Sequence, residues 1–276
     1  MIRLAPNFHH QFTELPIRQR FAAAAALGFD AVEWHFPYEL PKEELRSLLR
    51  DNGQTFVYAV TPSDWAANNY GLAGQPGREE EFRRAADKGL DYMLTIESHA
   101  MQVAPGDIPD GVDRQRCIDS LLHNLDYLCG QAKGSPLTLC LEGVCDARFP
   151  GKTFVLRTIA DAAGIVRDLN RDNLKVVFDT YHLRMQEQGS LSLLLDRYFD
   201  VIGHVQIGNA PVRNEPGTGE IDLHFLLERL EAKGYGHWVG LEYDPSRDSW
   251  ASLAWAERYG YARRPAASPN GTDRSR

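Results

Sequence analysis

Short apolar runs alternate along this chain with longer stretches in which apolar residues recur every three or four positions. The short runs are typical of buried parallel strands, and the longer stretches of amphipathic helices that cover a sheet. Three of the runs follow a glycine, Gly28, Gly89 or Gly234, which we interpret as the end of a helix. Strands are expected near residues 3–7, 31–35, 54–60, 92–97, 137–142, 174–179, 201–207 and 237–243.

Helical patterns lie between these expected strands. One begins at Pro41, a residue that suits the first turn of a helix. The four clearest apolar stripes are Leu45/Leu48/Leu49, Cys117/Leu121/Leu125/Leu128, Ile159/Ala162/Ala163/Val166 and Leu223/Leu226/Leu227/Leu230. Eight strands with intervening helices favour a closed (β/α)8 barrel, also called a TIM barrel, because closure removes the exposed edges of a parallel sheet. An open doubly wound sheet is the alternative, but no Gly-x-Gly-x-x-Gly run follows the first strand.

The length of 276 residues suits one such barrel. We expect a single catalytic domain over residues 1–261. Residues 262–276 are polar, contain proline and glycine and show no period, so they are expected to form a disordered tail.

Composition and charge narrow the classes of function. The net charge is −8 and no run of Lys or Arg exceeds two residues, which argues against nucleic acid and weakly against anionic membranes. No apolar stretch approaches the roughly 18 residues of a membrane span, and the N-terminus lacks the apolar core of a signal peptide. The four cysteines have no Cys-x-x-Cys spacing, which favours reduced thiols. A soluble, cytoplasmic protein with a small-molecule substrate is expected.

Active sites of this fold lie at the carboxyl ends of the strands. The last four expected strands end in, or lead into, Glu142, Asp179, Gln206 and Glu242. Their separations of 37, 27 and 36 residues each correspond to one βα unit, so all four side chains are expected at one mouth of the barrel.

Three carboxylates that converge without a cation would repel one another, and burying them unpaired is costly. A single divalent metal ion resolves this conflict. Three carboxylates and one amide oxygen suit Mg²⁺ or Mn²⁺ better than zinc. The alternative is that the acids pair with nearby arginines or mark strand ends in water.

Two further residues are candidates for contact with substrate. His182 follows Asp179 by three residues, close enough to reach a substrate on the metal, although a lone histidine is more often structural. Arg213, in the loop 211–220, could hold a substrate carboxylate through its fork of donors. A surface arginine paired with Glu215 or Glu220 is the alternative.

At these residues the sequence closely resembles the hydroxypyruvate isomerase family, within the xylose isomerase-like barrels that also include ketose 3-epimerases and endonuclease IV. The matching segments span nearly the whole chain: 18–21, 28–33, 36–38, 64–67, 76–82, 179–182, 203–207, 215–221 and 238–243. The glutamine at 206, where many relatives carry histidine, and the Glu-Pro-Gly-Thr-Gly-Glu-Ile loop are typical of this branch.

The resemblance implies that Glu142, Asp179, Gln206 and Glu242 bind one divalent ion (Mg²⁺, Mn²⁺ or Co²⁺). It also implies that Glu142 and Glu242 are a catalytic acid–base pair and that His182 and Arg213 contact substrate. The implied reaction interconverts the aldehyde and ketone forms of a small hydroxy-carbonyl acid, like hydroxypyruvate/tartronate semialdehyde or a 2-oxo-tetronate. Proton transfer through an enediolate that the metal stabilises is the expected mechanism.

The first half of the chain departs from the family pattern. Tyr58 stands where these isomerases usually carry a histidine at the end of strand three. The first strand leads into Asn7-Phe8-His9-His10-Gln11 rather than an Asn-Leu-Ser-Met-like run, and the second ends in Trp34-His35. The expected fourth strand ends in Glu97-Ser98-His99. We therefore expect Tyr58 and His99 to bind substrate, and the substrate to differ more than the chemistry.

Other functions use overlapping features. A sugar 3-epimerase or a dehydratase would start with the same proton removal. An endonuclease IV-like phosphodiesterase would need more histidine ligands and a basic face. A barrel that has lost catalysis and acts as a binding protein is the non-enzymatic alternative. Barrels of this kind often form dimers or tetramers, so a homo-oligomer is expected.

Overall fold

The structure is a computed structural model that describes residues 1–187 and 189–262. The expected C-terminal tail lies outside the described residues apart from Ala262. That residue is buried, and its backbone N–H donates to the carbonyl oxygen of Leu27 at 2.7 Å. The end of the described chain is therefore attached to the barrel beside the end of its first helix.

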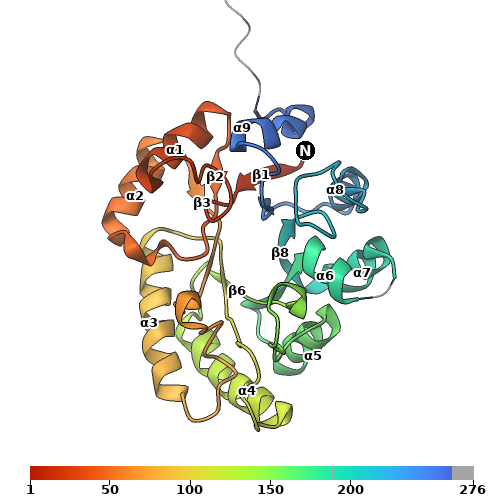
Figure 1. Cartoon of the computed structure of the whole chain (residues 1–276). Helices are drawn as coiled ribbons and strands as arrows, with labels where there is room; N and C mark the ends of the chain where they lie inside the picture. The colour runs from red at the N-terminus through yellow and green to blue at the C-terminus, as the bar shows by residue number, and fades with distance from the viewer. Residues whose placement is uncertain (188, 263–276) are drawn as a thin grey trace, which may run out of the picture.

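The strands form a parallel barrel (Figure 1). Their bounds are β1 Arg3–Pro6, β2 Ala31–Val32, β3 Thr55–Phe56, β4 Tyr58–Val60, β5 Ala100–Gln102, β6 Thr138–Leu141, β7 Leu174–Asp179, β8 Ile202–Ile207 and β9 Trp238–Leu241. Seven of them pair in the order β1-β9-β8-β7-β6-β5-β4, and β2 pairs with β3.

Two junctions close the ring. An isolated parallel bridge joins Asn7 to Glu33, just beyond β1 and β2. β3 and β4 are one strand interrupted at Val57, and the backbone N–H of Trp34 donates to the carbonyl oxygen of Tyr58 at 3.1 Å. The described residues thus occupy eight strand positions, and the predicted (β/α)8 barrel is confirmed.

Helices surround the strands (Figure 1). The α-helices are α1 Ile17–Ala26, α2 Lys42–Asp51, α3 Glu79–Thr95, α4 Arg114–Gln131, α5 Ile159–Leu169, α6 Thr180–Gln186, α7 Leu191–Tyr198, α8 Leu223–Ala232 and α9 Ser249–Ser252. Short 3-10 helices are η1 Pro37–Glu39, η2 Trp65–Ala67, η3 Asp146–Arg148, η4 Phe199–Val201 and η5 Ala254–Tyr259. The predicted stripes of α4, α5 and α8 are buried throughout, and in α2 Leu45 and Leu49 are buried.

One predicted strand is wrong. Residues 92–97 were expected to be the fourth strand, but α3 continues to Thr95 and the strand, β5, begins only at Ala100. Gly89 does not end a helix; it lies inside α3, where a Cβ would come within 2.8 Å of Pro62 and 3.2 Å of the Met101 sulfur. This glycine allows the helix to approach the barrel closely, so the same residue that indicated a helix end serves helix packing.

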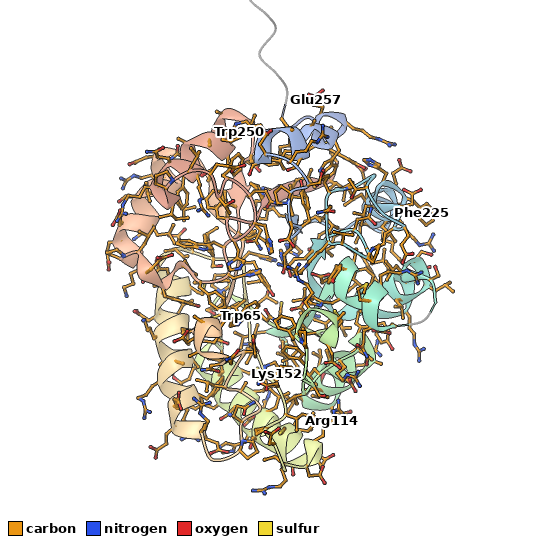
Figure 2. The ribbon with its side chains drawn as sticks, viewed as in Figure 1. Trp65, Arg114, Lys152, Phe225, Trp250 and Glu257 are labelled. Carbon is orange, nitrogen blue, oxygen red and sulfur yellow. The ribbon has the colours of Figure 1, made fainter. Side chains whose placement is uncertain are left out.

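The strand ends define one functional face. All pairs of adjacent strands in the sheet are parallel, so their carboxyl ends meet at the same mouth. Trp65 of η2 lies near the middle of the face shown in Figure 2, whereas the partly exposed Phe225 and Trp250 lie at its outer edge. Over the described residues, no helix combines the length and apolar character needed to cross a bilayer.

Candidate active site

Four polar side chains stand at the carboxyl ends of the last four strands. Asp179 is the last residue of β7, Gln206 lies in β8, and Glu142 and Glu242 directly follow β6 and β9. Asp179 pairs in register with Gln206, and Gln206 with Gly240. All four are buried, with exposed fractions of 6% or less. The structure therefore places these predicted ligands at one mouth of the barrel.

His182 is held beside the carboxylates by a helix cap. One oxygen of Asp179 accepts from the backbone N–H of His182 at 2.9 Å, which caps α6. The His182 ring then lies near Glu142 and Asp179, and one ligating atom from each of the three falls within 4.8 Å of the others. Its Nδ1 is 3.1 Å from the sulfur of Cys145, a free and buried thiol as predicted. These three residues form one candidate metal-binding group.

Arg213 lies between two of the acids. Its Nη2 donates to Asp179 Oδ2 at 2.8 Å and to Glu242 Oε1 at 2.5 Å, and its guanidinium lies 5.0 Å from the centre of the Tyr181 ring. The arginine is 6% exposed, so it is not a surface residue paired with Glu215 or Glu220. Burial works against its charge, but Glu242 and Asp179 raise the pKa of Arg213 above its usual range. It supplies one positive charge to three carboxylates.

The backbone around Arg213 is unusual. Its φ is +66°, a left-handed conformation that few residues other than glycine adopt. Two backbone hydrogen bonds of 2.7 Å, to Asn209 and from Asp244, hold it there. Gly208 packs against the Arg213 side chain, since a Cβ at Gly208 would come within 3.0 Å of Arg213 Cγ and 2.8 Å of the Glu242 carbonyl oxygen. The loop thus forces this side chain into the mouth of the barrel.

Gln206 is oriented by a residue that the sequence analysis did not assign to the site. Its Nε2 donates to Glu33 Oε1 at 2.9 Å, which leaves its buried Oε1 with no hydrogen-bond partner among the described residues. Glu33 also accepts from Asn7 Nδ2 at 2.8 Å, and its other oxygen is 2.8 Å from His204 Nε2. Gly240 leaves room for this carboxylate, because a Cβ there would be 2.2 Å from it. Glu33 therefore turns the amide oxygen of Gln206 away from itself.

A second unassigned residue, Gln102, holds Glu142. Gln102 ends β5, and its Nε2 donates to Glu142 Oε2 at 2.7 Å. Its own oxygen accepts from the Tyr58 hydroxyl at 2.9 Å, and the Tyr58 ring stacks on His204 with centroids 4.5 Å apart. Tyr58, predicted to bind substrate, is thus buried inside the barrel and reaches Glu142 only through Gln102.

His99 does not reach this site. It directly precedes β5, so it lies at the amino end of the strand, where its ring stacks on His237 with centroids 4.2 Å apart. His99 is expected to follow the carboxyl end of a strand because the sequence analysis places that strand at residues 92–97. Burial and the neighbouring His237 lower its pKa to about 4.

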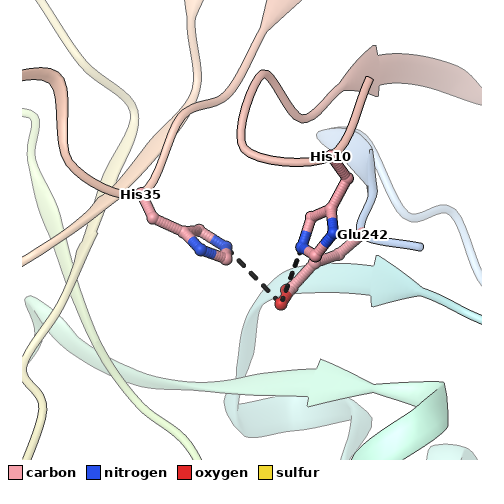
Figure 3. A group of neighbouring side chains, drawn as sticks. All are labelled: His10, His35 and Glu242. Atoms are coloured by element: carbon pink, nitrogen blue, oxygen red, sulfur yellow. Dashed lines mark ion pairs between the residues drawn. The ribbon is translucent and has the colours of Figure 1, made fainter. Parts of the chain in front are cut away.

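Three histidines from the first half of the chain border the site instead. His10 and His35 follow β1 and β2, and their Nε2 atoms lie 3.9 Å and 3.5 Å from Glu242 Oε1 (Figure 3). His9 stacks on His35 with centroids 4.9 Å apart. His10, His35 and Glu242 form a second group whose ligating atoms lie within 4.8 Å of one another.

A small cavity opens onto these residues. The space in which the centre of a water molecule can move is about 40 Å³. One wall is aromatic, formed by Trp65, Tyr70, Phe149 and Phe154. The polar wall consists of His35, Gln102, Glu142, His182, Arg213 and Glu242. This shape suits a compact ligand with polar atoms on one side.

The three carboxyl groups differ in the direction and size of their pKa shifts. Burial, Asp179 and Glu242 raise the pKa of Glu142 well above its usual range, and burial raises that of Asp179 to about 6. Although burial also disfavours its charge, Arg213 holds the pKa of Glu242 well below its usual range. The protein alone thus leaves part of this negative charge uncompensated.

A divalent cation fits the residues present. Gln206 Oε1 and Glu142 Oε1 are buried oxygen acceptors that lack hydrogen-bond partners in the described part of the chain. Both are atoms that a hard cation binds.

The sequence contained signals for both missed residues. Glu33 follows the apolar pair Ala31-Val32, as the other acids follow their strands. Gln102 ends β5, and the sequence analysis misses it because it expects that strand several residues too early, at 92–97.

Comparison with known proteins adds independent information. The family profile described as Xylose isomerase-like TIM barrel matches residues 21–259. A 2-oxo-tetronate isomerase of Cupriavidus necator is 38% identical over 94% of this chain and 99% of its own length. The hydroxypyruvate isomerase of Escherichia coli is 34% identical over 94% of this chain and its full length. A crystal structure described as an AP endonuclease, family 2, from Brucella melitensis has a TM-score of 0.89 at 33% identity, covering 94% of this chain and 99% of that one.

Proposed function

The chain belongs to the xylose isomerase-like TIM barrel family and is an isomerase, and we propose that it isomerises a small hydroxy-carbonyl acid beside one divalent metal ion. The observation that carries this proposal is the convergence, at the barrel mouth, of three buried carboxylates and one amide oxygen that has no hydrogen-bond partner among the described residues. The similar proteins named for 2-oxo-tetronate and hydroxypyruvate suggest the substrate class.

Glu142, Asp179, Gln206 and Glu242 would hold the ion. When bound, it supplies Lewis-acid polarisation of the substrate carbonyl and the adjacent hydroxyl group. Arg213 now contacts Asp179 Oδ2 and Glu242 Oε1, two of the same ligands. With their charge compensated, its guanidinium is free to donate to the carboxylate of an acid substrate. His182, in the polar wall of the cavity, is a second substrate contact.

Two glutamates would move the proton. Glu242, the one of the three acids whose pKa lies well below its usual range, takes the proton from the carbon that bears the hydroxyl group. Glu142, which Gln102 positions, returns a proton to the former carbonyl carbon. The hydroxyl proton passes to the neighbouring oxygen, so the product is an isomer of the substrate and no external oxidant or reductant is consumed. Glu242 then releases its proton to solvent and Glu142 takes one up, which restores both residues to their starting protonation states.

A panel of small hydroxy-carbonyl acids tests the proposal. The metal-free protein is assayed alone and with Mg²⁺, Mn²⁺ or Co²⁺ in heavy water, and products are identified by NMR. We expect metal-dependent interconversion of aldehyde and ketone forms with deuterium on the carbon that receives the proton. Inversion at a carbon without carbonyl transfer would indicate a 3-epimerase, and loss of water a dehydratase.

A nuclease is the second candidate, because the Brucella melitensis structure is described as an AP endonuclease. The net charge of −8 disfavours binding to a phosphate backbone. Cleavage of a DNA duplex containing an abasic site, at a rate that depends on Glu142, would replace the isomerase proposal.

A further inference from the structure

His10 and His35 lie close to Glu242, and we call this part of the site its imidazole side. Glu242 Oε1 has three neighbours: Arg213 Nη2 at 2.5 Å and the Nε2 atoms of His35 and His10 at 3.5 Å and 3.9 Å. Figure 3 shows the two histidines beside Glu242. The proposed function assigns no role to the two histidines. Both come from loops that follow the first two strands, and each directs a ring nitrogen at the same carboxylate oxygen, Glu242 Oε1.

The tautomer of His10 is set by its neighbour. Its Nδ1 lies 2.8 Å from Asp244 Oδ1, and Asp244 is itself paired with Arg148 at 2.8 Å. Because the carboxylate can only accept, Nδ1 carries the proton and Nε2 presents its lone pair. That Nε2 is buried and has no hydrogen-bond partner among the described residues. A carboxylate that orients a histidine in this way is the usual arrangement behind a metal-binding imidazole.

The tautomer of His35 is set by Asn7. The Asn7 side-chain oxygen accepts from the backbone N–H of His9 at 2.9 Å, which fixes the orientation of the amide. Its Nδ2 therefore donates to Glu33 Oε1 at 2.8 Å and to His35 Nε2 at 2.9 Å. The lone pair of His35 is thus also on Nε2. Binding a cation there replaces the hydrogen bond from Asn7, which keeps its contact with Glu33.

Two ring nitrogens consequently converge on one carboxylate oxygen: His10 Nε2 has no hydrogen-bond partner among the described residues, and His35 Nε2 accepts from Asn7. The separations from Glu242 Oε1 are 3.5 Å and 3.9 Å. Ligands about 2.0–2.1 Å from a tetrahedral zinc ion lie roughly 3.4 Å apart, so small side-chain shifts would complete the geometry. Two histidines and one glutamate are also the protein ligands of many catalytic zinc sites.

We propose that His10, His35 and Glu242 bind a second divalent cation, of the borderline class that includes Zn²⁺ and Co²⁺, with Glu242 shared between the two ions. Imidazole ligands select this class, whereas the oxygen ligands on the other side select Mg²⁺ or Mn²⁺. Asp244 is the positioning residue for His10. The inference shares Glu242 with the proposed function but can fail separately from it.

The test measures metal content by equilibrium dialysis of the metal-free full-length protein against Zn²⁺, followed by mass spectrometry. We expect two ions per chain in the wild-type protein and one in His10→Gln and in His35→Gln, with an affinity for the second ion at least 100-fold weaker. Asp244→Asn should weaken it by about 10- to 100-fold. His9→Gln is the matched control, because His9 is adjacent but outside the ligand group, and should retain two ions. Glu142→Gln should retain the ion on the imidazole side.

One ion in the wild-type protein, lost in Glu142→Gln but retained in His10→Gln and His35→Gln, would overturn the inference and leave the proposed function intact. Two ions retained in both histidine variants would also overturn it. If these variants raise KM for an acid substrate without changing metal content, the histidines bind substrate instead. Circular dichroism and thermal melting confirm that each variant is folded.

Discussion

The two ends of the barrel contain similar residue types and differ in what they do with them. At the carboxyl end, Glu142, Asp179 and Glu242 converge around one arginine, with buried oxygen atoms unpartnered in the described structure. At the amino end, His99 stacks on His237, and Arg3 lies 3.5 Å over the Trp238 ring. The first arrangement concentrates negative charge, and the second packs rings together. The difference shows that strand direction decides whether a polar residue beside a strand belongs to a site.

The largest effect is expected at the carboxyl end. Glu142→Gln keeps the shape of the side chain but cannot exchange a proton, so kcat should fall by about 10³-fold or more on a confirmed substrate. Steady-state kinetics with saturating metal measures this. Undiminished turnover would break the assignment of Glu142 and with it the contrast between the two ends.

A smaller effect on activity is expected for Gln102, which contacts Glu142 from inside the barrel. Gln102→Met removes the donor to Glu142 Oε2 while preserving volume. Because Glu142 is then held less firmly, kcat should fall by about tenfold to a hundredfold with a smaller change in KM. Comparison with Glu142→Gln tells whether Gln102 acts through that residue, since the double variant should then be no slower than Glu142→Gln alone.

Tyr58→Phe separates two interpretations of the barrel interior. The structure places the hydroxyl on Gln102, so its loss should lower kcat severalfold, leave KM nearly unchanged and lower the free energy of unfolding by about 1 kcal/mol. Kinetics and chemical denaturation together measure this. A large rise in KM would instead support direct contact with substrate, as the sequence analysis expected.

The smallest effect on activity is expected at the amino end. His99→Phe keeps a stacked ring and should leave kcat and KM unchanged. It should change the pH dependence of stability. The pKa of His99 is lowered to about 4, so between pH 6.5 and 4 the unfolded chain binds a proton that the folded protein excludes, and the wild type loses stability as the pH falls.

Thermal or urea denaturation at pH 7 and pH 5 measures this contribution, which should be on the order of 1 kcal/mol between the two values. The variant should lose less stability than the wild type over that interval. His123→Phe, on the exposed face of α4, is the control and should behave like the wild type. Equal losses in His99→Phe and the wild type would contradict the assigned pKa.

Prediction from the sequence succeeded where a short apolar run ends at the same residue as the strand. The strands that carry Glu142, Asp179, Gln206 and Glu242 were located to within about two residues, because each apolar run is short and ends in a polar side chain. It failed at β5, where Tyr92 and Met93 belong to the buried face of α3 and resemble a strand in isolation. That error of a few residues moved His99 to the wrong end of the barrel and hid Gln102.

The amino-acid sequence by itself determined the barrel, its family and the three acids and one amide at the last strand ends, because hydrophobic period and chain direction are local properties. Only the tertiary structure decided that Arg213 bridges two of these acids, that Glu33 orients Gln206, and that His10 and His35 face Glu242. These contacts join residues that are far apart in the sequence: Arg213 and Glu242 are separated by 29 residues, and Gln206 and Glu33 by 173. Closure of the ring and the backbone conformations that aim each side chain inward bring these residues into contact, and no local sequence pattern encodes that.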